Sequence, residues 1–244
     1  MYQFFVDSSQ INGNDIVIIG SDVNHIKNVL RMKVGEEVAV SNGVDGKEYR
    51  CEIAGIQDDL VRLTLRFAKE DGLELPSKVY LFQGLPKGDK MEFIIQKMVE
   101  LGVYEIIPVA TKRCVVKLDD KKANSKIQRW QGIAEAAAKQ SKRRIVPQVQ
   151  RVMTFGEALQ YAKDMDLKLI PYELAEGMET TRKLIEGVRP EQSIAVFTGP
   201  EGGFEEGEIA KANEQGVEPI TLGKRILRTE TAGLTVMAWL MYQL

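Results

Sequence analysis

Residues Ser193–Gly203 read SIAVFTGPEGG, and residues Ile220–Ala232 read ITLGKRILRTETA. In each segment a short apolar run is followed directly by a loop that contains small residues. The apolar runs predict buried strands, and loops that leave the carboxyl ends of strands commonly form the ligand sites of α/β sheets. The two segments together therefore predict an α/β fold with a ligand pocket.

A glycine-rich turn alone has a simpler explanation, because glycine permits positive φ and many such turns only reverse the chain. The second loop favours a site. Gly223, after Leu222, is small enough for close approach, and the Arg-Thr-Glu-Thr helix start at Arg228 offers free backbone amides. Tyr172 and Glu173 also follow an apolar run, so three strand ends are expected to form one pocket.

Strand and helix patterns alternate in the second part of the chain, which predicts a parallel sheet covered by helices. A helix is expected from Asp89 to a stop at Gly102, with Met91, Ile94, Ile95 and Met98 at helical spacing. The expected strands are 79–82, 105–109, 167–172, 195–198 and 218–222. Connections without a knot are the usual rule, so these patterns alone indicate a Rossmann-like sheet.

The first part of the chain has a different pattern. Short runs rich in branched residues, at 16–19, 37–40, 49–53 and 60–65, alternate with turn signals such as Asn42-Gly43. They predict a small β-barrel, interrupted by one helix capped by Ser21. The polar segment Lys69–Pro76 is expected to be a linker, which divides the chain into domains at 1–70 and 74–244.

The two loops belong to a longer series of motifs that covers almost the whole chain. The others are LPKGDK at Leu85–Lys90, QKMVELG at Gln96–Gly102, VVKLDD at Val115–Asp120, and Trp130 leading to Glu135-Ala136-Ala137 and Gln140-Ser141. In this order the motifs resemble the RsmE-type 16S ribosomal RNA (uracil-N3) methyltransferases of the SPOUT class. The resemblance implies a PUA-like β-barrel at 1–70 that binds RNA and a SPOUT methyltransferase domain at 74–244 with a trefoil knot.

The resemblance also implies S-adenosylmethionine as the cofactor, bound against the loops. The residues that match the cofactor motifs are Tyr172, Glu173, Thr198, Gly199, Pro200, Gly202, Gly203, Leu222, Gly223, Ile226, Leu227, Arg228, Thr231 and Ala232. The implied reaction is methylation of uridine N3 near the 3′ end of 16S rRNA, in the decoding region, with the 30S subunit as the implied substrate. Two alternatives are another SPOUT RNA methylation, at a ribose 2′-OH or a different base, and a non-catalytic RNA-binding module.

Methyl transfer to N3 requires loss of the imide proton and tight positioning. Arg228 is the first candidate, because its fixed cation could orient the base or stabilise charge on a uracil carbonyl oxygen. Alternatively, Arg228 forms a structural salt bridge with Glu201 or Glu230, which are themselves weaker candidates for the base. The single histidine, His25, lies in the barrel domain, and the two cysteines are 63 residues apart, so no metal site is predicted.

Basic residues are concentrated in one region although the net charge is only −2. Twelve Lys or Arg and three acidic residues lie between Thr111 and Arg151, which leaves +9 there and −11 elsewhere. At helical spacing Ile127, Trp130 and Ala134 share one face, while Arg129, Lys139 and Arg143 lie opposite. This face could be merely solvated, but the flanking lysines and arginines favour RNA phosphates. The RNA-binding candidates are Arg31, Lys87, Lys112, Arg113, Arg129, Lys139 and Arg143.

Two positions depart from the family pattern: Gln3 stands where the family often has arginine, and Cys114 where it usually has serine. ATP and NAD fingerprints are absent, as are a long apolar run and a cationic leader, so we expect neither membrane span nor secretion and a cytoplasmic protein. The segment Ala232–Leu244 is apolar on more than one side and is expected to be buried, as a core helix or at a subunit interface. The resemblance favours a homodimer.

Overall fold

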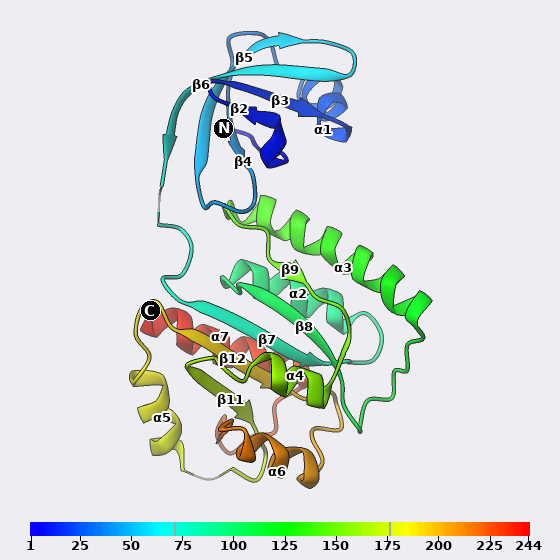
Figure 1. The fold of residues 1–244 in the computed structure, drawn as a ribbon, viewed down its shortest axis with the longest axis vertical. Helices are drawn as coiled ribbons and strands as arrows, with labels where there is room; N and C mark the ends of the chain where they lie inside the picture. Colours follow the sequence, from blue (N-terminus) through cyan, green and yellow to red (C-terminus); the bar gives the residue numbers. More distant parts are fainter. Residues whose placement is uncertain (71, 176) are drawn as a thin grey trace. The chain divides into compact units, whose positions relative to one another are not determined.

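The computed structural model describes residues 1–70, 72–175 and 177–244, which form two compact units (Figure 1). The first unit contains Met1–Glu74 and Ala138–Val146, and the second contains Leu75–Ala137 and Pro147–Leu244. The sequence placed all of 74–244 in one domain, whereas a short internal segment in fact packs with the first unit. Asp71, in the expected linker, lies outside the described residues.

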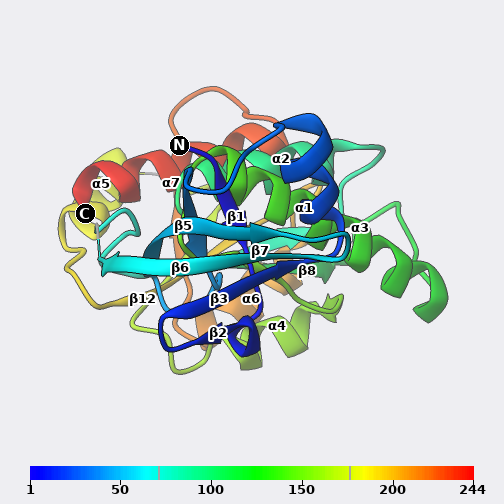
Figure 2. The same cartoon turned by 90° about the horizontal axis from the view of Figure 1, so that it is seen from above.

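The first unit is built on a six-stranded sheet in which every pairing except β1 with β4 is antiparallel. Its strands, in spatial order, are β1 (Gln3–Phe5), β4 (Glu37–Ser41), β5 (Glu48–Ile56), β6 (Leu60–Lys69), β3 (Asp15–Ile19) and β2 (Ile11–Asn12). Figure 2 shows β5, β6 and β3 side by side in this sheet. Alternate residues such as Ile16 and Ile18 are buried on one face, as period-two patterning requires.

One short helix covers this core. It consists of α1 (Ser21–Asn24) and the π-helical turn η2 (His25–Val29), and it buries Val23 and Ile26. The sequence predicted Ser21 as the N-cap of this helix, but Ser21 is its first helical residue. Gly20, with a φ of 76°, is the N-cap. The brief 3-10 turn η1 (Ser8–Gln10) is closed by a capping box from Asp7.

The segment Ala138–Val146 is held to the first unit by two buried arginines. Arg143 Nη2 lies 2.5 Å from Glu74 Oε2, and Arg144 pairs with Glu48. Gln3 completes the arrangement by donating to the Arg143 carbonyl and accepting from Arg144, each at 3.0 Å. Gln3 is therefore a structural residue in this chain.

Arg143 does not lie on the charged face of a helix, which corrects its expected placement. Helix α3 (Asp120–Gln140) ends before it, because Lys142 adopts a left-handed φ of 60° and turns the chain. Arg143 is consequently 5% exposed. The predicted charged face assumed that the helix continues to Arg143, whereas α3 ends at Gln140.

The second unit contains a sheet in which all pairings are parallel. Its strands, in spatial order, are β10 (Met153–Thr154), β8 (Glu105–Ala110), β7 (Lys78–Gly84), β12 (Ser193–Thr198), β11 (Leu167–Pro171) and β13 (Glu218–Ile220), with β9 (Gln148–Val149) also paired to β8. The alternation of strands and helices thus correctly predicted a parallel, helix-covered sheet. The trefoil knot implied by the resemblance stays a prediction.

Helices cover both faces of this sheet (Figure 1). Helices α4 (Phe155–Tyr161) and α6 (Glu206–Glu214) pack on one face around Phe82 and Phe197, whose rings stack with centroids 4.4 Å apart. Helices α2 (Lys90–Glu100) and α7 (Thr229–Gln243) pack on the other, and α5 (Met178–Glu186) contacts α7 and β13. Among the described residues, no helix has the length and apolar composition needed to cross a membrane.

Helix α7 buries only one stripe of its surface, formed by Thr229, Gly233, Val236, Met237 and Leu240. The sequence predicted burial, either as a core helix or at a subunit interface. Within this single chain Met241 is 43% and Tyr242 91% exposed, so burial at an interface stays a prediction. The opposite side of the helix therefore presents apolar surface within this single chain.

Candidate cofactor pocket

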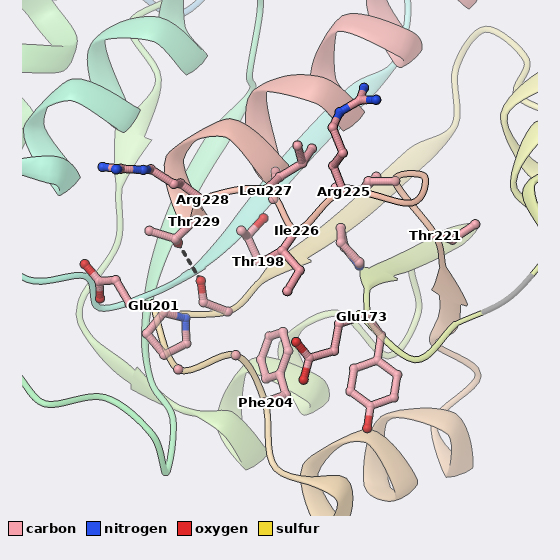
Figure 3. Close-up of a pocket in the computed structure, with 18 of the residues that line it drawn as sticks. Glu173, Thr198, Glu201, Phe204, Thr221, Arg225, Ile226, Leu227, Arg228 and Thr229 are labelled. Atoms are coloured by element: carbon pink, nitrogen blue, oxygen red, sulfur yellow. Dashed lines mark hydrogen bonds between the residues drawn. The ribbon is translucent and has the colours of Figure 1, made fainter.

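A cavity of about 500 Å³ lies where the carboxyl ends of β11, β12 and β13 meet (Figure 3). Its walls are formed by residues 171–173, 198–204 and 221–229, together with Lys90 and Ala232. Because the three strands are parallel neighbours, their terminal loops converge at one edge of the sheet. This is the convergence that the sequence predicted for the three loops.

The loop Gly199–Gly203 is packed too tightly for larger residues. Gly203 donates to the Pro200 carbonyl at 2.9 Å and has a φ of 66°, which closes the turn. A Cβ on Gly199 would lie 3.1 Å from the Gly203 backbone, and a Cβ on Gly84 would lie 2.6 Å from Pro200 Cδ. Glycine is thus required here for space as well as for the turn.

The second loop ends in an uncapped helix start. Gly223, at a φ of 98°, donates to Thr221 Oγ1 at 3.3 Å, and the chain then leads to Arg228, the N-cap of α7. Arg228 makes no side-chain capping bond, so the first-turn amides of α7 stay available. Such amides, with the helix dipole, attract negatively charged groups.

Glu201 links the glycine loop to the start of α2. Its carboxylate accepts from the Lys87 amide at 3.1 Å and from Lys90 Nζ at 2.7 Å. Partial burial acts to raise the pKa of Glu201, but the hydrogen bonds from Lys90 and from the backbone outweigh it and leave the pKa below its usual value. Glu201 is therefore an ionised clamp across the mouth of the pocket and a poor proton acceptor.

Glu230 does not line the cavity. Its carboxylate lies 3.8 Å from Lys90 Nζ, and its buried Oε2 has no hydrogen-bond partner among the described residues. Lys90 therefore stands between two carboxylates. The sequence analysis missed Lys90 as a pocket residue, although its place at the start of α2 in the motif LPKGDK was a usable signal.

Arg228 lines the cavity and is exposed. In the described part of the chain it forms no ion pair with Glu201 or Glu230, which pair with Lys90 instead. The alternative of a purely structural salt bridge therefore finds no support. Figure 3 shows Arg228 and Arg225 pointing away from the middle of the cavity in different directions, while Glu173, Phe204 and Ile226 lie around it.

The structure brings nearly all the predicted cofactor residues together. Those that line the cavity are Tyr172, Glu173, Thr198, Gly199, Pro200, Gly202, Gly203, Leu222, Gly223, Ile226, Leu227, Arg228 and Ala232. Thr231 is the exception, because it is an exposed residue on the first turn of α7 and lies outside the lining. Besides Lys90, sequence reasoning missed Pro171, Phe204, Thr221, Lys224, Arg225 and Thr229.

Of the predicted RNA-binding residues, Arg113 contacts the glycine loop, and Lys112 contacts Glu205 and Glu208 at the start of α6. Arg113 Nη1 donates to the Gly202 carbonyl at 2.9 Å, and the Lys112 amide donates to Glu208 Oε1 at 3.0 Å. Both side chains remain exposed. Cys114 follows Arg113, and its Sγ lies 3.2 Å from Thr111 Oγ1. The thiol therefore makes the contact within this turn that a serine hydroxyl could also make.

The other predicted RNA-binding residues are spread over both units. In the second unit, Lys87 is exposed and Arg129 pairs with Glu92 at 2.8 Å. In the first unit, Lys139 pairs with Asp22 at 3.2 Å, and Arg31 is exposed with a φ of 53°. Within the described ranges no group of three or more His, Cys, Asp or Glu could hold a metal ion.

Comparison with known proteins gives consistent results for both units. Residues 73–241 match the RNA methyltransferase domain family, and residues 18–66 match the RNA methyltransferase PUA domain family. The chain is 41% identical over 229 residues to the ribosomal RNA small subunit methyltransferase E of Bacillus subtilis, covering 93% of this chain and 89% of that protein.

Solved structures of similar chains agree with these family matches. The ribosomal RNA small subunit methyltransferase E of Neisseria gonorrhoeae, bound to S-adenosylmethionine, is 33% identical with a TM-score of 0.83, covering 98% of this chain and 95% of that one. A putative methyltransferase of Legionella pneumophila with the same bound cofactor is 31% identical, also with a TM-score of 0.83, covering 98% and 96%.

Proposed function

The chain belongs to the ribosomal RNA small subunit methyltransferase E family, and from that membership we propose that it transfers a methyl group from S-adenosylmethionine to a base of small-subunit ribosomal RNA. The observation that carries the proposal is the glycine-lined cavity at the ends of β11, β12 and β13. A non-catalytic RNA-binding module would have no need for such a cavity.

The residues of the cavity fit this cofactor. Gly199, Gly202 and Gly203 allow the backbone to approach a flat ring closely, and the free amides at the start of α7 suit a carboxylate. Thr198 also lines the cavity, but its Oγ1 is buried toward Gly233 of α7 and is not exposed to the ligand space. When bound, the cofactor supplies the methyl group from its sulfonium.

The charged side chains at the mouth of the cavity have different proposed roles. Lys224, Arg225 and Arg228 give the rim a positive field that favours an RNA phosphate or a developing carbonyl oxyanion. Arg228 is free to orient the target base, because Lys90 already neutralises Glu201. Glu201 holds the glycine loop against the start of α2 and keeps the mouth in one shape.

The proposed target is N3 of a uridine in the decoding region near the 3′ end of 16S rRNA, within the 30S subunit, which places the enzyme in the cytoplasm. This choice rests on the resemblance of the motifs. The exposed cation Arg113 supports it, because it lies beside Gly202 and could contact a phosphate next to a base at the pocket.

The proposed assembly is a homodimer. The side of α7 turned away from the sheet exposes Met241 and Tyr242, and α2, which contacts α7, exposes Phe93. Apolar surface of this kind is usually covered by a partner. Size-exclusion chromatography with light scattering should give twice the mass of the chain, and Met241→Asp should shift it to the monomer; a monomeric unmodified protein would contradict the proposal.

Thermal unfolding with and without S-adenosylmethionine tests the proposed cofactor. At a hundredfold excess over its dissociation constant the ligand should stabilise the protein by about 2.7 kcal/mol. ATP at the same concentration is the matched control and should give no shift. No stabilisation by S-adenosylmethionine would favour the RNA-binding module instead.

A further inference from the structure

We infer that Gln83 is a positioning residue for the cofactor pocket, although it does not itself line the cavity. Its carboxamide fixes the hydroxyl of Thr229, and that hydroxyl holds the carbonyl of Gly199. This inference rests on the proposed function, since it takes S-adenosylmethionine to be the ligand of the pocket.

Gln83 is a polar residue in the centre of a buried sheet. It is the second-to-last residue of β7, and none of its surface is exposed. Its Nε2 donates to the Gly84 carbonyl and to Thr229 Oγ1, both at 2.9 Å. Because the Gly84 carbonyl can only accept, the amide nitrogen must face it, which fixes the orientation of the carboxamide.

The bond to Thr229 determines where the threonine hydroxyl points. Thr229 Oγ1 accepts from Gln83, so its own hydrogen is directed to another acceptor, the Gly199 carbonyl at 2.5 Å. Figure 3 shows this second bond as a dashed line beneath the cavity. A single chain of hydrogen bonds thus joins the end of β7, the first residue of α7 and the loop after β12.

Thr229 and Gly199 both line the cavity, and the loop that begins at Gly199 forms one of its walls. The surroundings leave the loop little room to adjust, because Gly84 lies directly against Pro200. On the far side, a Cβ on Gly233 would meet Met98 at 2.8 Å and Thr198 Oγ1 at 3.2 Å. A change in the hydrogen-bond chain would therefore be transmitted to the wall of the pocket.

Stability alone does not favour glutamine at this position. Gln83 Oε1 is buried and has no hydrogen-bond partner among the described residues. An unpaired buried acceptor destabilises the folded protein. Methionine has a similar length and would avoid the unpaired acceptor, but it would also remove the donor to the Gly84 carbonyl and to Thr229 Oγ1. The role of the carboxamide is therefore the position that it gives to Thr229 and Gly199.

The test compares variants by the dissociation constant of S-adenosylmethionine in titration calorimetry and by the melting temperature. Gln83→Met removes the carboxamide at similar volume, and Thr229→Val removes the hydroxyl at similar shape. Each should weaken binding about tenfold, or about 1.4 kcal/mol. The double variant should bind no more weakly than the weaker single variant, because both break the same chain of bonds. Thr229→Ser keeps the hydroxyl and should bind within about threefold of the unmodified protein, a difference that corresponds to well under 1.4 kcal/mol.

Ser77→Ala is the matched control. Ser77 is 5% exposed, precedes the other end of β7, and donates to the Arg189 carbonyl at 2.9 Å, far along the strand from the pocket. The variant should lower the melting temperature and leave cofactor binding unchanged. In methyl transfer assays Gln83→Met should raise the KM for S-adenosylmethionine more than it lowers kcat.

The outcomes separate the inference from the function on which it rests. If the unmodified protein binds the cofactor and Gln83→Met binds it equally well, the inference is wrong and the proposed function stands. If the unmodified protein does not bind the cofactor, the proposed function fails and the inference fails with it. Should Gln83→Met not fold, the pair Thr229→Val and Thr229→Ser decides, since equal affinity in these two would also refute the inference.

Discussion

Replacing Gly84 by alanine should displace the wall of the cofactor pocket. The added Cβ would lie 2.6 Å from Pro200 Cδ, 2.7 Å from Pro200 N and 3.0 Å from Gly199 C. Carbon atoms in contact prefer a separation of about 3.5–4.0 Å, so the loop or the strand must move by about 1 Å. Overpacking of this kind usually costs about 1–3 kcal/mol. Since each kcal/mol corresponds to about 2–4 °C in a protein of this size, the melting temperature should fall by several degrees.

The displaced atoms belong to the backbone of the cofactor loop, so the loss should extend beyond stability. A misplacement of about 1 Å can reduce turnover by about 100-fold. We expect at least a tenfold weaker affinity for S-adenosylmethionine in calorimetry. Gly132→Ala is the control, because nothing lies within 4 Å of the added Cβ on α3, and alanine there should raise stability by about 1 kcal/mol. Normal cofactor affinity in Gly84→Ala would refute the reasoning.

Other substitutions test separate parts of the account. Arg228→Ala should leave the melting temperature and cofactor affinity unchanged while reducing kcat by about 100-fold, as loss of one preorganised donor does; normal turnover would remove Arg228 from the mechanism. Arg31→Gly should stabilise the first unit by roughly 1 kcal/mol in urea denaturation, because glycine adopts the left-handed φ of 53° without strain. The same variant should bind RNA more weakly, and the slope of its RNA affinity against salt concentration should fall by about one. Unchanged RNA affinity would show that Arg31 does not contact RNA. Arg144→Ala should cost about 1–3 kcal/mol, because the buried Glu48 loses one partner and keeps its pairs with Arg50 and Lys69, and unchanged stability would contradict this role. The pKa of Glu201 is lowered in the folded protein, so the stability that its clamp contributes is present above its usual pKa of 4.5 and is lost on further acidification; Glu201→Gln should remove that part of the pH dependence of the melting temperature.

The pocket could be predicted from the sequence because its parts are local. Apolar runs indicate strands, and the loops that follow Thr198 and Ile220 carry their small residues in the sequence itself. Parallel strands then bring these loops to one edge, whatever the rest of the fold does. This is why almost all the predicted cofactor residues line one cavity.

Residues whose role depends on a distant partner could not be predicted in this way. Gln83 has no local pattern that distinguishes it, and its partner Thr229 lies 146 residues further along the chain. Lys90 lines the cavity and pairs with Glu201, 111 residues further along the chain, and its motif was the one local signal for this position. Arg143 was misplaced for a different reason, because the left-handed turn at Lys142 occurs without a glycine and leaves no mark in the sequence.

The most direct test of the account is labelled methyl transfer from S-adenosylmethionine to 30S subunits isolated from cells that lack this protein, with the product nucleoside identified by mass spectrometry. The account predicts labelled 3-methyluridine, and a much slower reaction with Arg228→Ala. A different methylated nucleoside would contradict the proposed target, and absence of any label, with cofactor binding confirmed, would contradict the assignment of the 30S subunit as substrate.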